Sequence, residues 1–229
     1  MPLSDGHGTV EVMPQTTYAP HTILVHGLGR SRFDMILLAR RLSKLLPETK
    51  IHTFDYPSRK ISLAQMTEEL NDFVAQATKG APVSFIGHSL GGIVVRALDQ
   101  RGDTAAPLQR LVTLGSPHGG ATIAAALCRY SPFRALFGPI LTELGTLSLA
   151  ETPRQLEIGC IVGALNSRFG FLPIFGEDND GLVLVREAHL SSSRDSVQRA
   201  IFHGLFPFSA EAARLSATFL QHGSFEKSE

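Results

Sequence analysis

The stretch FIGHSLGGIVVRAL, residues 85–98, decides the fold. It begins as the end of an apolar run, as a buried strand does, and it ends with helical spacing of its apolar residues. Between the two lies Gly87-His88-Ser89-Leu90-Gly91, which fits the pattern G-x-S-x-G. At a sharp strand-to-helix turn the glycines remove side chains that would collide, and the serine hydroxyl stands exposed at the helix N-terminus. This context predicts that Ser89 is a nucleophile; the alternative is a glycine-rich turn with an incidental serine.

Strands and helices alternate on both sides of this turn. Such an order predicts an α/β fold, with a mostly parallel central sheet covered by helices on both faces. We find no internal repeat and no linker, which predicts one domain over residues 1–229. The predicted strands are 22–27, 50–57, 82–87, 108–115, 154–165 and 197–204, and the predicted helices are 31–46, 66–78, 90–101 and 209–223.

The segment 119–152 interrupts the alternation. It is rich in small and apolar residues, and Pro132 and Pro139 divide it into short helical pieces. It lies between two predicted strands on the side where the chemistry is expected. The sequence leaves two interpretations open: additional core, or a small apolar cap or lid over the site.

Composition excludes several classes of protein. Of 229 residues 43% are hydrophobic, and 21 basic residues balance 21 acidic ones, so nothing favours nucleic acid as a partner. No apolar run is long enough for an integral membrane segment, and the first residues lack a secretory signal, which predicts a cytoplasmic protein. No phosphate-loop, dinucleotide or metal-ligand spacing is present, so we expect no cofactor and no metal, and Cys128 and Cys160 are expected to be buried free thiols.

A serine nucleophile needs a base, which an acid orients. In this layout the partners should follow later strands. Asp180 in GEDNDGLVLV precedes Gly181 and a new apolar run, so it is preferred to Glu177 and Asp178 as the acid. As the base we favour His203, which follows the last predicted strand, over His189 in a polar stretch.

An oxyanion intermediate needs two preorganised N–H donors. One should be the amide of Leu90, directly after Ser89. The other should come from HGLGRS, the loop after the first predicted strand, where Leu28 is the natural donor. The alternative is that this loop is only a turn from a strand to a helix.

Four blocks in the order VHGLGRS, GHSLGG, LGSPHGG and NDGLV, followed by a histidine near the C-terminus, resemble the α/β-hydrolase superfamily, and within it the bacterial lipases and esterases. The resemblance implies a compact α/β-hydrolase fold and hydrolysis of carboxylic esters through an acyl-enzyme. In such enzymes NDGLV contains the triad acid, which supports Asp180, and the spacing to the triad histidine favours His203 over His189. Secreted relatives often hold calcium through an aspartate after that histidine; here Gly204 and Leu205 follow, so no calcium is expected.

The substrate is expected to be a small-molecule ester or lipid, with short or medium acyl chains favoured by the small size of segment 119–152. A thioesterase, an amidase or an acyltransferase on the same scaffold remains the alternative, followed by a non-catalytic binding protein. Apolar side chains that could line an acyl pocket, or could be core, include Phe133, Phe137 and Phe171. The sequence does not indicate an oligomeric state.

Overall fold

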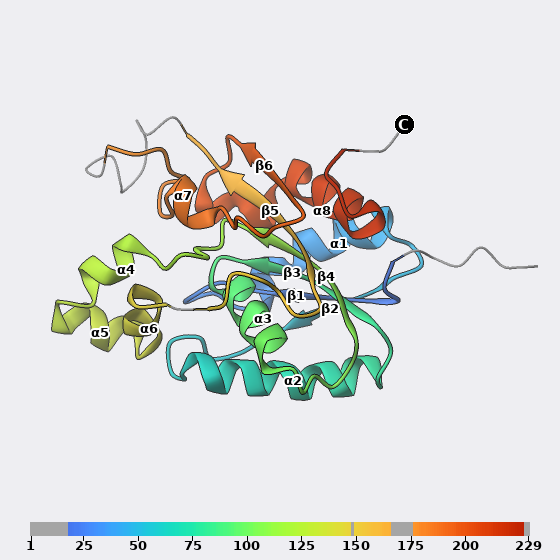
Figure 1. Ribbon diagram of the computed structural model, residues 1–229, viewed down its shortest axis with the longest axis horizontal. Coiled ribbons are helices and arrows are strands. Elements are labelled where there is room, and N and C mark those ends of the chain that lie inside the picture. Colours follow the sequence, from blue (N-terminus) through green and yellow to red (C-terminus); the bar gives the residue numbers. More distant parts are fainter. Residues whose placement is uncertain (1–17, 148, 166–175, 227–229) are drawn as a thin grey trace, which may run out of the picture.

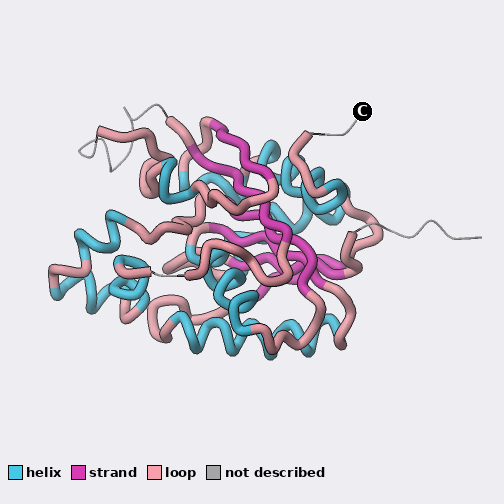
Figure 2. The backbone as a smooth tube through the Cα atoms, viewed as in Figure 1, coloured by secondary structure: helices cyan, strands magenta, loops and turns pink. Residues whose placement is uncertain are grey.

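The computed structural model describes residues 18–147, 149–165 and 176–226. Within these residues, six strands form one parallel sheet in the order β2-β1-β3-β4-β5-β6. Figure 2 shows the strands as a layer between helices, which confirms the predicted α/β architecture. The strands are β1 (His21–Val25), β2 (Lys50–Phe54), β3 (Val83–His88), β4 (Leu108–Leu114), β5 (Glu157–Gly163) and β6 (Asp195–Arg199).

Each face of the sheet is buried by its own set of helices (Figure 1). Because successive side chains of a strand point to opposite faces, Phe85 packs with α2 and α3, whereas Ile86 packs with α1 and α8. Capping boxes mark two of the helix starts: Ser31 with Asp34 at η1, and Ser62 with Gln65 at α2. The helices are the 3-10 helix η1 (Arg32–Met35), α1 (Ile36–Leu45), α2 (Leu63–Thr78), α3 (Leu90–Arg101), α4 (Thr122–Leu127), α5 (Ser131–Phe137), α6 (Ile140–Gly145), α7 (Val185–Ala188), the 3-10 helix η3 (His203–Phe208) and α8 (Ala210–His222).

The last strand differs from its prediction. The sequence predicts a strand over 197–204, but β6 ends at Arg199 and His203 begins η3. At this edge β6 pairs only with β5, and the register ends where Gly163 meets Arg199, so later residues have no partner strand. The apolar residues after Arg199 do not extend the strand; Ile201 is instead buried in the core cluster that includes α1 and α8.

Three short helices, α4, α5 and α6, separate β4 from β5 and lie together at one end of the molecule (Figure 1). Ile140, Leu141 and Leu144 on α6 are buried and belong to the core cluster on the α2–α3 face, while Tyr130 and Leu136 are exposed. This group of helices thus contributes core and also presents an apolar outer surface. Of the two free thiols, that of Cys160 is buried and that of Cys128 is half-buried.

Candidate active site

Ser89 occupies a tight turn between β3 and α3. Its backbone has φ 53° and ψ −122°, a conformation that residues other than glycine rarely adopt. The turn also needs its glycines: a Cβ on Gly87 would lie 2.4 Å from the backbone nitrogen of Gly92, and one on Gly91 would lie 2.2 Å from the carbonyl oxygen of Val25. The spacing of G-x-S-x-G is therefore set by close approach of α3 to the ends of β1 and β3.

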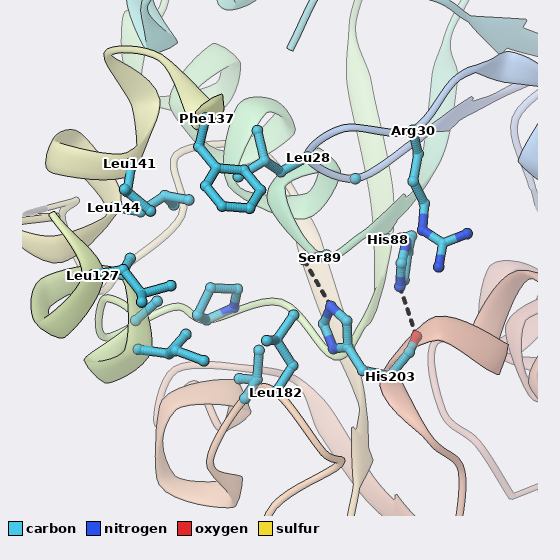
Figure 3. A pocket seen from close by; sticks show the side chains of 16 residues that line it. Leu28, Arg30, His88, Ser89, Leu127, Phe137, Leu141, Leu144, Leu182 and His203 are labelled. Carbon is cyan, nitrogen blue, oxygen red and sulfur yellow. Dashed lines mark hydrogen bonds between the residues drawn. The ribbon is translucent and has the colours of Figure 1, made fainter. Parts of the chain in front are cut away.

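Three side chains from distant parts of the chain form a connected hydrogen-bonded series. Ser89 Oγ lies 3.0 Å from His203 Nε2 (Figure 3), and His203 Nδ1 lies 2.7 Å from Asp180 Oδ2. The other carboxylate oxygen of Asp180 accepts the backbone N–H groups of Leu182 at 3.0 Å and Val183 at 2.7 Å. Asp180 is 1% exposed and His203 is 8% exposed, so water has little access to either group. The predicted base, His203, thus contacts both the predicted serine and the predicted acid.

The competing residues lie elsewhere. His189 is exposed at the end of α7. Glu177 is exposed and pairs with Arg186 at 2.7 Å, and Asp178 accepts the N–H of Asn179 at 2.8 Å. Of the carboxylates that the sequence offered, the structure brings Asp180 to the imidazole of His203.

The sequence interpretation missed a contact of His88, because His88 occupies a variable position of the G-x-S-x-G motif. Its Nε2–H donates to the carbonyl oxygen of His203 at 2.9 Å (Figure 3), and the two rings lie 5.0 Å apart. Its buried Nδ1 has no hydrogen-bond partner among the described residues. Burial, together with the nearby His203, holds the pKa of His88 well below its usual value, so the ring stays neutral behind His203. A histidine inside G-x-S-x-G was the only sequence signal of this contact.

The loop after β1 is held by buried polar contacts. The hydroxyl of Tyr56 donates to the carbonyl oxygen of His26 at 2.7 Å, and His26 Nδ1 donates to the carbonyl oxygen of Gly27 at 2.9 Å. The N–H of Gly29 donates to Ser58 Oγ at 2.9 Å. Burial lowers the pKa of His26, against the raising effects of the bond to Gly27 and of Asp55. Tyr56 and Ser58 come from the segment after β2, and no motif in the sequence pointed to them.

The two predicted oxyanion donors flank the serine. Leu28 lies in this fixed loop and lines the same cavity as Ser89. Leu90 is the first residue of α3, where backbone N–H groups have no acceptor within the helix. Their role as oxyanion donors stays a prediction.

A cavity of about 260 Å³ opens beside Ser89 and His203. Phe137 lines it, as predicted, whereas Phe133 is not among its lining residues and is 38% exposed, and Phe171 lies outside the described residues. The sequence interpretation missed much of the apolar lining, which comes from the helices of segment 119–152 and from the turn after Asp180. Those residues are Ile123, Ala124, Leu127, Leu141, Leu144, Leu182 and Val183.

Among the residues that the structure describes, no group of three or more histidine, cysteine, aspartate or glutamate side chains could hold a metal ion. Nor does any helix in the described ranges have the length and apolar character needed to cross a bilayer.

Solved structures with related folds include several hydrolases. Lipase BlEst2 of Bacillus licheniformis in its mature form is 19% identical, with a TM-score of 0.64 over 82% of this chain and 86% of that chain. The product of gene lin2722 of Listeria innocua is 16% identical, with a TM-score of 0.60 over 92% and 96%. The Vlm2 thioesterase domain is 14% identical, with a TM-score of 0.57 over 90% and 94%.

A search of curated proteins returned no significant match. The structural matches confirm the α/β-hydrolase fold, with lipases, esterases and thioesterases as neighbours. The family model of palmitoyl protein thioesterases matches residues 21–147, more than half of the chain, and its range includes Leu28, Ser89 and the cavity-lining helices α4 and α6. On this match the chain belongs to the palmitoyl protein thioesterase family of α/β-hydrolases.

Proposed function

We propose that this chain is a serine hydrolase that cleaves carboxylic esters through an acyl-enzyme, with Ser89 as nucleophile, His203 as base and Asp180 as the orienting acid. The observation that carries the proposal is the unbroken series from Ser89 Oγ to His203, at 3.0 Å, and from His203 to Asp180, at 2.7 Å. The family match independently supports a hydrolytic enzyme of the esterase and thioesterase type.

In the proposed reaction Asp180 accepts the Nδ1–H of His203, which leaves the lone pair of Nε2 facing the serine hydroxyl. As Ser89 Oγ attacks the substrate carbonyl, its proton moves to Nε2. The resulting imidazolium is stabilised by Asp180 and then protonates the leaving alcohol as the C–O bond breaks. A water molecule repeats the sequence on the acyl-enzyme, and its attack releases the acid and restores Ser89.

Charge on the carbonyl oxygen needs donors that are already in place. We propose the amides of Leu28 and Leu90 for this role. The contacts of Tyr56 and Ser58 support it, because they hold the loop of Leu28 before substrate arrives. The dipole of α3, whose N-terminus faces Ser89, favours the same negative charge.

The cavity and the helices above it suggest the acyl group. A volume of about 260 Å³ lies at the small end of ligand pockets, which favours short or medium acyl chains. We propose that α4–α6 form a small cap whose apolar inner side chains receive the acyl chain, and that the chain works as one domain. Because the family model is that of palmitoyl protein thioesterases, a thioester is the second candidate substrate.

The test compares p-nitrophenyl esters from acetate to palmitate with matched thioesters, for the native protein and for Ser89→Ala. We expect turnover that is highest for short or medium chains and is almost abolished in Ser89→Ala. Ser43→Ala is a matched control, since Ser43 is an exposed residue of α1 whose hydroxyl donates to the carbonyl oxygen of Ala39. A native protein that cleaves neither series, or a Ser89→Ala variant as active as Ser43→Ala, contradicts the proposal.

A further inference from the structure

The cavity beside Ser89 has two chemically different ends. On one side of the serine lie apolar side chains from the cap helices and from the turn after Asp180 (Figure 3). On the other side lie His88 and Arg30 (Figure 3). Arg30 is the only lysine or arginine among the described residues that line this cavity. An acyl chain matches the apolar end, so the leaving group is directed toward Arg30.

The guanidinium of Arg30 is fixed at this end. Its Nη1 donates to Asp34 Oδ1 at 3.0 Å, and its Nη2 donates to the carbonyl oxygen of Gly204 at 3.4 Å. Gly204 directly follows His203, and a Cβ at this position would lie 3.0 Å from Arg30 Nη2. Arg30 therefore bridges the loop of Leu28 and the loop of His203.

These contacts leave N–H groups of the guanidinium available to donate to a ligand. It has five N–H groups, and the bonds to Asp34 and Gly204 use two of them. The ion pair with Asp34 is a single bond rather than a two-bond fork, and the Arg30 side chain remains 29% exposed. A planar guanidinium with free N–H groups beside an apolar cavity suits an oxyanion, above all a phosphate, whose oxygens accept from several directions.

We propose that Arg30 forms the leaving-group end of the substrate site and binds a phosphate carried by the alcohol of the ester. The inference rests on the proposed function, because Ser89 fixes where the scissile bond lies. Since Arg30 and Ser89 line one cavity of about 260 Å³, the phosphate must lie only a few bonds from the ester oxygen. A glycerol phosphate ester, with an apolar acyl chain at one end and a phosphate at the other, has this form.

Two sources share this chemistry: a phosphate monoester of an acylglycerol, and the phosphodiester of a lysophospholipid. Ether analogues that cannot be hydrolysed separate them. We would measure by calorimetry the binding of hexylglycerol, hexylglycerol 3-phosphate and hexylglycerol 3-phosphocholine to the native protein, Arg30→Gln, Arg30→Lys and Arg32→Gln. Arg32 is a matched control, because it is exposed, stacks on Phe33 and does not line the cavity.

The native protein should bind at least one phosphate ligand about tenfold or more tightly than hexylglycerol, as a charge-assisted hydrogen bond predicts. Arg30→Gln should lose that preference, Arg30→Lys should keep part of it, and Arg32→Gln should keep it. Whether the monoester or the diester binds more tightly identifies the source.

The inference is overturned if the native protein binds all three ligands equally, or if Arg30→Gln keeps the preference. It is also overturned if Arg30→Gln weakens hexylglycerol as much as the phosphate ligands, which would make Arg30 only a structural bridge between the two loops. Because these measurements need no turnover, they are independent of the p-nitrophenyl assay. Esterase activity without a phosphate preference would end this inference and leave the proposed function standing.

Discussion

Replacing Asp180 by asparagine tests the proposed proton path with almost no change of shape. The oxygen that accepts the N–H groups of Leu182 and Val183 is retained, so the turn keeps its contacts. The atom facing His203 Nδ1 changes from an acceptor to an NH₂ donor. To keep this bond, His203 must move its proton from Nδ1 to Nε2, where it blocks acceptance of the serine proton.

The expected cost follows from that tautomer change. A base held in the wrong tautomer loses about 10⁴-fold in kcat, which corresponds to about 5.4 kcal/mol of transition-state stabilisation. Asp180 is 1% exposed, so water cannot replace the lost acceptor. The free energy of unfolding should change far less, by about 1 kcal/mol, because a hydrogen bond to His203 can still form.

The assay is turnover of the best p-nitrophenyl ester, with urea unfolding measured on the same samples. Asp178→Asn is the control, because Asp178 lies two residues away and bonds the N–H of Asn179 rather than His203. If both variants are folded and the kcat of Asp180→Asn lies within tenfold of the kcat of Asp178→Asn, the proposed role of Asp180 is refuted.

Three further predictions test the surroundings of the site. Gly91→Ala places a Cβ 2.2 Å from a backbone oxygen of β1 and should lower the free energy of unfolding in urea by about 1–3 kcal/mol. Gly119→Ala, which has open space around it, should lower that free energy little. Equal losses for the two variants would contradict the packing argument. His88→Leu removes the hydrogen bond to the His203 carbonyl oxygen, so it should lower kcat and alter the pH profile of kcat. His88→Gln can still donate to that oxygen and should restore part of both properties. Identical kinetics for the two variants would exclude a positioning role for His88. Burial, and then Arg96, lowers the pKa of His118 from 6.5 to about 3, so the unfolded chain gains a proton that the fold excludes. Stability should therefore fall between pH 6.5 and 3 by up to about 1.4 kcal/mol per pH unit from this group, and His118→Gln should show a shallower fall in unfolding measurements; parallel slopes would contradict it.

The sequence predicted the elements of this fold well where the relevant forces act locally. Alternating apolar runs and capping boxes indicate strands and helix starts, and G-x-S-x-G encodes a turn whose glycines are needed within a few residues. The candidate site followed because parallel strands present their carboxyl ends at one edge. The structure then places His203 in contact with both Ser89 and Asp180, and the catalytic roles of the three residues stay predictions.

The missed features depend on contacts between remote segments. Nothing near Tyr56 or Ser58 in the sequence shows that they support the loop after β1, because that contact follows from the pairing of β1 with β2. The contact of His88 with the His203 carbonyl depends likewise on where η3 begins. The apolar lining of the cavity depends on how α4 and α6 pack, which periodicity alone does not determine.

The central claim is that Ser89 is an activated nucleophile, and covalent trapping tests it most directly. The native protein, incubated with a fluorophosphonate, should gain one phosphonyl group per chain, located by peptide mass spectrometry on Ser89. Ser89→Ala should gain none, and His203→Gln should react far more slowly. A folded native protein that stays unmodified, or that carries the group on another residue, would contradict the account.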